Sequence, residues 1–209
     1  MTVEQPGKRR GRPIGFDPED VVRDLVMLFW EKGYEDTTQA DMVERTGLSS
    51  SSLYNTFGDK PAIFGRVLER YNEWVASACQ PMLVGGSGLG GLEEFVEWRL
   101  AHVLEPVGTF SGCLMVTTMC ERGAHVPQVE QQCEDYRAIQ RKAISAAIDR
   151  AVNQQEIVPG DTDVRAALLV ALSIGAAATA RSTTMTGEAI AMIEGMRQLV
   201  HSWTIRTET

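Results

Sequence analysis

The segment between residues 38 and 60, TQADMVERTGLSSSSLYNTFGDK, decides the fold of the N-terminal third. Thr38 is followed three residues later by Asp41, and this spacing is typical of the capping box that begins a helix. Gly47 ends this helix, because glycine readily adopts the left-handed conformation found after helix ends. The segment therefore predicts a short helix followed by a tight turn.

A second short helix follows the turn. Ser49 is placed to cap it, Leu48 and Leu53 are spaced as a hydrophobic staple, and Gly58 stops the helix. Its outward positions carry hydrogen-bonding groups and no charge: Ser50, Ser51, Ser52, Tyr54, Asn55 and Thr56. Two short helices joined through glycine are typical of a helix-turn-helix, whose second helix enters a DNA major groove. A helix face that is simply solvated has the same polarity, so this pattern alone leaves both interpretations open.

Longer helices are predicted on both sides of this segment. Asp17 caps a helix with Pro18 in its first turn, and an apolar face at helical spacing leads to Gly33 at its end. Asp59 caps another helix, over residues 60–79, which buries one apolar face. The short pair is therefore framed by two amphipathic helices.

A basic arm precedes the first helix. The chain of 209 residues has 20 Lys and Arg against 28 Asp and Glu, a net charge of −8, so no global positive field attracts a polyanion. The arm is an exception, because Lys8, Arg9, Arg10 and Arg12 are close together. An extended Arg-Gly-Arg-Pro stretch fits a DNA minor groove, where arginine responds to negative potential. A solubilising tail has the same composition, but its combination with the uncharged helix favours DNA.

Taken together, these features resemble a known family. Residues 16–68 are similar to the DNA-binding domain of the TetR/AcrR family of bacterial transcriptional regulators. The resemblance is carried by Phe29-Trp30-Glu31-Lys32-Gly33-Tyr34, Thr37-Thr38, Met42-Val43, Gly47-Leu48-Ser49, Leu53-Tyr54, Phe57-Gly58-Asp59-Lys60 and Ile63-Phe64. It implies a homodimer that binds a palindromic operator in double-stranded DNA, and a variable C-terminal domain that binds a small-molecule effector.

The resemblance also assigns DNA contacts to particular residues. Thr38, Tyr54 and Lys60 are expected at phosphates, and Ser50, Ser51, Asn55 and Thr56 at bases. The full candidate set adds Gln39, Ser49, Ser52 and the arm residues Arg9, Arg10 and Arg12. Family members often carry an apolar residue in place of Gln39, and a Lys, Arg, Gly or Pro within the run of four serines. The operator sequence is therefore not predicted, and the arm is expected to matter more than in a relative without one.

The remaining two thirds contain helical patterns and no competing strand pattern. Helices are predicted near residues 92–104, 110–122, 127–155, 163–185 and 188–205, and the glycine-rich stretch 85–91 is predicted to be a loop. The fold class is therefore all-α, with about nine or ten helices. We divide the chain into a flexible basic arm (1–15), a three-helix helix-turn-helix DNA-binding domain (16–60) and a helical ligand-binding and dimerisation domain (61–209).

Small residues predict where two subunits meet. The helix expected over 163–185 carries Ala167, Ala171, Gly175, Ala176 and Ala180, which allow helix backbones to approach closely. Together with Ile190, Ile193, Met196, Leu199, Val200 and Trp203 it is expected to form a four-helix bundle between two subunits. A core within one chain is the alternative.

Candidate effector-binding residues are aromatic, methionine or histidine side chains. They are Trp74, Phe95, Trp98, His102, Met115, Met119 and Tyr136. A mostly apolar cavity with a few polar groups suits a small apolar effector. Ordinary core packing uses the same residue types, and no charged group singles out a ligand class.

Two cysteines raise an alternative mode of regulation. The stretch Ser111-Gly112-Cys113-Leu114, with Cys120 following, resembles a segment in one branch of the family, in which some members sense oxidants or electrophiles through cysteine. Cys113 and Cys120 are therefore redox candidates. Seven residues apart on one helix, they would be separated by about 10 Å, too far for a disulfide between them. Buried structural thiols are the competing interpretation.

Motifs for catalysis or metal binding are absent from the sequence. The histidines His102, His125 and His201 lie in separate segments, and there is no H-E-x-x-H, G-x-S-x-G, P-loop or paired-cysteine zinc spacing. We therefore expect no enzymatic activity, no cofactor and no metal site.

The longest apolar stretch covers residues 166–178 and is shorter than the roughly 20 residues that cross a bilayer, so it predicts a buried helix and no membrane association. The N-terminus has no apolar core of a secretory signal, and the cysteines have no close pairing. These observations favour a protein of the cytoplasm with reduced thiols.

Overall fold

The computed structural model describes residues 15–104, 112–121, 126–181 and 186–205, and the arm candidates Arg9, Arg10 and Arg12 lie outside these ranges. Within them the chain forms α1 (Pro18–Asp36), α2 (Gln39–Thr46), α3 (Ser50–Phe57), α4 (Lys60–Val84), α5 (Gly88–Leu104), α6 (Leu114–Cys120), α7 (Pro127–Asn153), α8 (Thr162–Thr179) and α9 (Thr186–Ser202). The sole β feature of the described residues is an isolated bridge between Ile157 and Thr204. The predicted all-α class is confirmed.

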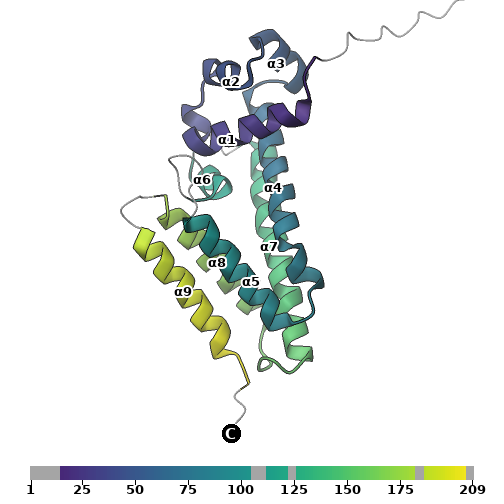
Figure 1. The fold of residues 1–209 in the computed structure, drawn as a ribbon, viewed down its shortest axis with the longest axis vertical. Helices are drawn as coiled ribbons and strands as arrows, with labels where there is room; N and C mark the ends of the chain where they lie inside the picture. The colour runs from purple at the N-terminus through teal and green to yellow at the C-terminus, as the bar shows by residue number, and fades with distance from the viewer. Residues whose placement is uncertain (1–14, 105–111, 122–125, 182–185, 206–209) are drawn as a thin grey trace, which may run out of the picture.

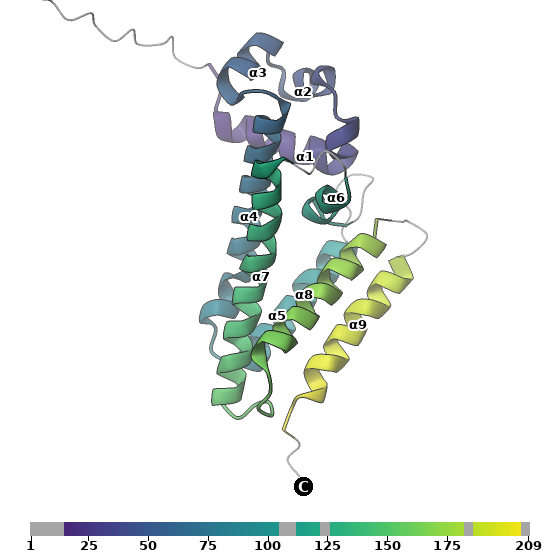
Figure 2. The same ribbon diagram turned by 180° about the vertical axis from the view of Figure 1, so that it is seen from behind.

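The helices form a head and an elongated body (Figures 1 and 2). Helices α1, α2 and α3 make the head, and α4 leaves it to run beside α7 along the length of the molecule. Helices α5 and α8 pack obliquely against this pair, and α9 packs on the outer side of α5 and α8. The short α6 lies just below α1 and contacts α1, α7 and α8. Two helices, α4 and α6, therefore connect the head with the body.

The head is built around the apolar face predicted for α1. Leu25 and Phe29 are fully buried, and the ring of Phe29 packs 4.8 Å from that of Phe64 on α4. From α3, Leu53 and Phe57 point into the same core. Gly33 has a φ of 80°, as expected for a glycine at a helix end, although the assigned helix resumes and continues to Asp36.

The predicted glycine loop at 85–91 is wrong in its second half, because α5 begins at Gly88. The reason lies in tertiary packing, since a Cβ atom at Gly88 would come within 2.0 Å of the backbone nitrogen of Ala151 on α7. Glycine thus permits close helix contact here. The amide nitrogens of Gly88 and Leu89 donate to the side chains of Gln154 and Glu156, which supply the cap that the glycine-rich sequence lacks.

Helix α4 is also longer than predicted, ending at Val84 rather than near residue 79. Pro81 lies within its last turns, where a proline ordinarily ends a helix. Arg150 on α7 donates to the carbonyl oxygens of Met82 and Leu83, at 2.6 and 3.2 Å. This long-range contact stabilises the extension. The helices predicted over 110–122 and 163–185 are shorter than expected, because α6 spans Leu114–Cys120 and α8 ends at Thr179. Residues 110, 122 and 185 themselves lie outside the described residues.

Helix α8 corrects a further prediction. We expected a buried helix, yet only a third of its residues are buried within the chain. Among the described residues it is the one helix long and apolar enough to cross a membrane, a test that core helices of soluble proteins also pass. Its exposed positions include Val164 and Leu168, which leaves an apolar face without a partner in the single chain.

Candidate nucleic-acid interface

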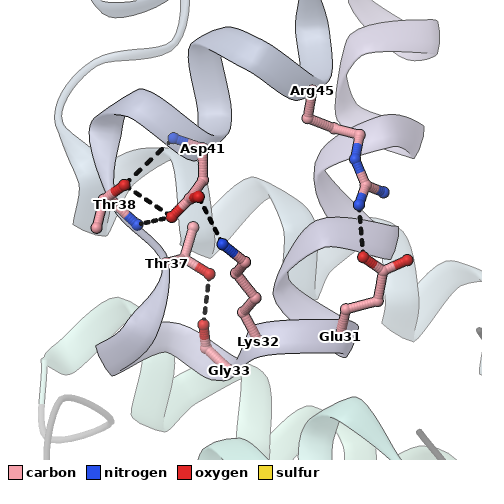
Figure 3. A network of polar contacts seen from close by, with 7 residues as sticks. All are labelled: Glu31, Lys32, Gly33, Thr37, Thr38, Asp41 and Arg45. Atoms are coloured by element: carbon pink, nitrogen blue, oxygen red, sulfur yellow. Dashed lines mark hydrogen bonds and ion pairs between the residues drawn. The ribbon is translucent and has the colours of Figure 1, made fainter. Parts of the chain in front are cut away.

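The predicted capping box at the start of α2 is confirmed (Figure 3). The Asp41 backbone nitrogen donates to Thr38 Oγ1 at 3.2 Å, and the Thr38 nitrogen donates to Asp41 Oδ2 at 2.8 Å. Lys32 Nζ on α1 forms an ion pair with the same carboxylate. Its hydrogen bond, followed by those from Thr38, lowers the pKa of Asp41 well below its usual range. The cap is therefore also an attachment between α1 and α2.

Two further contacts fix α2 against α1 (Figure 3). The buried Thr37 hydroxyl donates to the Gly33 carbonyl oxygen at 2.6 Å. Arg45, in the last turn of α2, pairs with Glu31 on α1. Because both ends of α2 are held, the turn into α3 starts from a fixed position.

The start and the inner face of α3 are as predicted. Gly47 adopts the left-handed conformation with a φ of 67°, and Ser49 Oγ accepts from the Ser52 backbone nitrogen at 3.2 Å. Leu53 and Phe57 face the head core. The remaining side chains of α3 therefore face outward.

Not all of these outward side chains are equally available to a ligand. Ser49 Oγ bonds to the hydroxyls of Ser51 and Ser52, at 3.1 and 2.9 Å. The side chains of Tyr54, Asn55 and Thr56, in contrast, make no hydrogen bond to another described residue. Asn55 is also exposed. Asn55 thus has the polar group best placed to read a base edge, where an amide can bind adenine with two hydrogen bonds.

Gln39 has a role that the sequence did not reveal. Its Nε2 donates to Ser50 Oγ and so links the first residue of α2 with the first residue of α3. This contact explains why a polar side chain occupies a position that is often apolar in the family. Any DNA contact made by Gln39 or Ser50 has to share these groups with the link.

Lys60 begins α4, after Asp59 caps the helix by accepting from the Ala62 nitrogen at 3.0 Å. Its Nζ lies 4.5 Å from the centre of the Tyr34 ring, a cation–π contact. Partial burial lowers the pKa of the Lys60 ammonium. A phosphate contact by Lys60 remains a prediction, supported by its place beside the amino end of α4.

The head carries an unfavourable overall charge for DNA. Residues 16–60 contain ten Asp and Glu but four Lys and Arg, a net charge of −6, and α3 has no charged residue. Attraction to phosphates therefore depends on local cations and on the arm, whose DNA contacts remain a prediction.

A contact between α6 and the head was not predicted. Both carboxylate oxygens of Glu121, just after α6, accept from the Tyr34 backbone nitrogen at 3.2 and 3.0 Å. Burial raises the pKa of Glu121. The contact joins residues 87 positions apart in sequence, so no local pattern indicates it.

The candidate effector residues fall into two groups. The rings of Trp74 and Trp98 lie 4.7 and 4.6 Å from that of His102, and Phe95 stacks on Trp98 at 5.7 Å. Trp74 also lines a pocket of about 320 Å³ between α1 and α4. The second group lies nearer α6 and α7: Met115 and Tyr136 are buried and Met119 is half-buried. An effector role for these residues remains a prediction.

Sequence reasoning also missed Arg99, which is 1% exposed in the middle of the body. Its Nε donates to Ser173 Oγ at 2.7 Å, and its Nη2 donates to the Tyr136 hydroxyl at 3.0 Å. A signal was available, because Arg99 continues the apolar series Leu92, Phe95, Val96 and Val103 at helical spacing. A charged residue in such a series indicates a buried charge.

A capped helix, a left-handed glycine turn and an uncharged polar helix presented to solvent define a helix-turn-helix DNA-binding protein. The family model for bacterial regulatory proteins of the tetR family matches residues 24–67, from α1 into α4. The chain belongs to this TetR family, and it is a DNA-binding transcriptional regulator.

Similar proteins support this assignment. The HTH-type transcriptional repressor ComR of Escherichia coli (strain K12) is 28% identical over 159 residues, which cover 73% of each chain. The uncharacterized HTH-type transcriptional regulator YezE of Bacillus subtilis (strain 168) is 26% identical over 75% of this chain and 80% of YezE.

Solved structures share the fold. The reduced form of E. coli NemR superposes with a TM-score of 0.77 at 18% identity, covering 91% of this chain and 100% of NemR. A cysteine mutant of the TetR family regulator CifR, complexed with 26-bp double-strand operator DNA, superposes with a TM-score of 0.75 at 21% identity. That match covers 92% of this chain and 100% of CifR.

Proposed function

We propose that this regulator is a cytoplasmic repressor that binds a palindromic operator as a homodimer and is released by a small effector with an apolar body. The main support for DNA binding is the outward face of α3. There the side chains of Tyr54, Asn55 and Thr56 make no hydrogen bond to another described residue. Ser50, Ser51, Asn55 and Thr56 read bases in the major groove, and Thr38, Tyr54 and Lys60 hold phosphates. Arg9, Arg10 and Arg12 enter the adjacent minor groove.

The apolar face of α8 supports the homodimer. Val164 and Leu168 are 55% and 46% exposed, and Ala167, Ala171 and Ala178 continue the same stripe at helical spacing. A second copy of the chain offers an identical stripe, and small residues let two such helices approach closely. On α9, Ile190 is exposed, whereas Ile193, Met196 and Val200, with Trp203 just after the helix, are buried within one chain. For those four residues the alternative of an intramolecular core is the better interpretation.

The dimer surface has a direct test. Leu168→Glu places a charge on the exposed stripe and should shift the protein from dimer to monomer in sedimentation equilibrium. Val84→Glu is the matched control, because Val84 is also an exposed apolar residue, at 71%, but lies at the end of α4. A Leu168→Glu protein that remains as dimeric as the control would contradict this dimer face.

The two connections between head and body support the proposed release by an effector. Helix α4 runs from Lys60 into the body, and Glu121 after α6 holds the Tyr34 backbone. Recognition helices of a dimer must be about one DNA turn apart to enter successive major grooves. A shift of α4 or α6 changes this spacing and so weakens operator binding.

The decisive experiment is selection of bound duplexes from a random DNA pool by the full-length protein. The expected result is an inverted repeat whose half-sites are about one helical turn apart. Asn55→Ala in a parallel selection should relax preference at one position in each half-site. Failure to enrich any sequence over the starting pool would refute the proposal.

A second candidate function is regulation through a thiol, favoured by the surroundings of Cys113. Its Sγ lies 3.0 Å from the Tyr71 hydroxyl and 3.2 Å from the Tyr136 hydroxyl. Cys120 is exposed at the end of α6. Modification of Cys113 would disturb its contact with Tyr71 on α4, and modification of Cys120 would act next to Glu121, which contacts the head. Operator binding by Cys113→Ser and Cys120→Ser proteins before and after oxidant treatment tests this, and full retention of the oxidant response in both refutes it.

A further inference from the structure

Arg99 is a buried cation without an anionic partner. Its hydrogen bonds go to Ser173 on α8 and to Tyr136 and Gln140 on α7, all of them neutral side chains. It forms no ion pair with a carboxylate of the described residues. Burying a charge is costly unless an opposite charge and hydrogen bonds compensate for the lost water, and here only the hydrogen bonds are present.

The neighbouring phenols do not supply the missing negative charge. Burial is the largest cause that raises the pKa of both Tyr71 and Tyr136, so both hydroxyls are protonated at neutral pH. Gln140 and Ser173 do not ionise in this range, and Ser173 Oγ donates onward to Gln140 Oε1 at 3.2 Å. None of the side chains that bond to the guanidinium therefore supplies a negative charge to balance it.

A neighbouring donor is also left without an acceptor. The Arg99 Cζ lies 4.6 Å from the centre of the Trp98 ring, and the buried Trp98 Nε1 has no acceptor among the described residues. An unpaired buried donor costs free energy that an added acceptor recovers. A positive charge beside an unpaired donor suits a ligand with negatively charged oxygens.

We propose that Arg99 binds the effector, and that the effector is a small carboxylic acid with an apolar or aromatic body. This inference rests on the proposed effector-responsive function and specifies its ligand class. The carboxylate pairs with the guanidinium, which matches its planar geometry. The apolar body lies against aromatic side chains such as Phe95 and Trp98, which stack beside Arg99.

The position of Arg99 connects such a ligand to the head. A carboxylate competes with the Tyr136 hydroxyl for Nη2 of Arg99. That hydroxyl lies next to Cys113 Sγ, and the same sulfur lies next to the hydroxyl of Tyr71 on α4. Cys113 directly precedes α6. Binding at Arg99 therefore disturbs the contacts that set both α4 and α6, the two helices that join the body to the head.

The test compares acids with amides of the same shape on the full-length protein. The probes are benzoate, 1-naphthoate and octanoate against benzamide, 1-naphthamide and octanamide, with tryptophan fluorescence and thermal unfolding as readouts. At least one acid should bind about tenfold to a hundredfold more tightly than its amide, the range given by a hydrogen-bonded charge. Arg99→Gln should abolish this preference. Arg165→Gln is the matched control, because Arg165 also stacks on a tryptophan, with 4.7 Å between its Cζ and the Trp203 ring centre.

Several outcomes would overturn the inference. They are a wild-type protein that responds to none of the acids, one that responds equally to acids and amides, and an Arg99→Gln protein that keeps the preference. Should Arg99→Gln fail to fold, as judged by circular dichroism, the acid and amide comparison on the wild type decides alone. DNA binding is measured separately without any acid, so loss of the DNA function with retained acid preference would refute the proposed function and leave this inference standing.

Discussion

Two polar regions of the molecule, the outward face of α3 and the cluster around Arg99, place similar groups in opposite surroundings. On α3, hydroxyl and amide groups lie at the surface, where water satisfies them and base edges can replace that water at little cost. Around Arg99, a charge and several neutral partners are held in the body with almost no access to water. A polar surface has many explanations, whereas a buried charge is expensive. The cluster around Arg99 therefore gives more information about the function of the body than the apolar residues of the body do.

Removing the arm should have the largest effect, because the reading surface on α3 has no charge of its own. Deletion of residues 1–13 removes four basic residues. Since each phosphate contact contributes about 0.9 to the dependence of log affinity on log salt, the slope should flatten by up to about 3.6. Fluorescence anisotropy with a selected duplex over a salt series measures this. Lys142→Gln, which removes an exposed charge on α7, is the control, and equal slopes for the deletion and the wild type would contradict the role of the arm.

Tyr136→Phe tests the buried cluster. It removes the hydroxyl that accepts from Arg99 Nη2, and loss of a hydrogen bond to a buried charge should lower the free energy of unfolding by about 2 kcal/mol. Urea denaturation gives this value. Tyr34→Phe is the matched control, because the Tyr34 hydroxyl makes no hydrogen bond to a described residue, and its effect should stay within about 0.5 kcal/mol. Equal stability of the two variants would show that the cluster does not depend on this contact.

Asn55→Ala and Ser49→Ala separate binding from stability within the head. Asn55 is exposed and free, so its replacement should weaken binding to the selected operator about tenfold while leaving stability unchanged. Ser49 caps α3, so its replacement should lower the free energy of unfolding by about 1 kcal/mol. Anisotropy and urea denaturation of both variants measure the two effects. The distinction fails if Asn55→Ala destabilises the fold as much as Ser49→Ala does.

The smallest expected effect concerns the pH dependence at Glu121. Burial raises its pKa above the ordinary value of 4.5, although Arg181 and the Tyr34 amide oppose this and Glu35 and Asp36 add to it. When the pKa of a carboxyl group is raised in the folded state, its contribution to stability is fully present below its pKa in the unfolded chain. That contribution is lost as the pH rises through its pKa in the folded state. The wild type should therefore lose stability relative to Glu121→Gln, which keeps an acceptor for Tyr34, as the pH rises above 4.5. Parallel stability curves for the two proteins would disprove this.

Local patterns predicted the head well. The Thr38 and Asp41 capping box, the Ser49 cap and the left-handed Gly47 were each expected from residues at most four apart, and each is present. Such bonds form between neighbours in the chain, so residue type and spacing are enough to indicate them.

The contacts that connect elements were not predicted. Gln39 bonds to Ser50 across the turn, Glu121 reaches the Tyr34 backbone, and Arg150 extends α4 past its proline. The glycine stretch was misjudged for the same reason, because Gly88 fits against α7 only once both helices are packed. In each case the residue that makes the contact belongs to a different segment of the fold, so no local sequence pattern indicates it.

The sequence by itself determined the helical class, the capped pair of short helices and the resemblance to a family of DNA-binding regulators, because hydrophobic spacing and caps act over a few residues. The tertiary structure decided which polar groups are exposed on α3, which face of α8 is left open, and that Arg99 is buried among neutral partners. Burial depends on segments far apart in the chain, and the cost of a charge is set by its surroundings rather than by its identity.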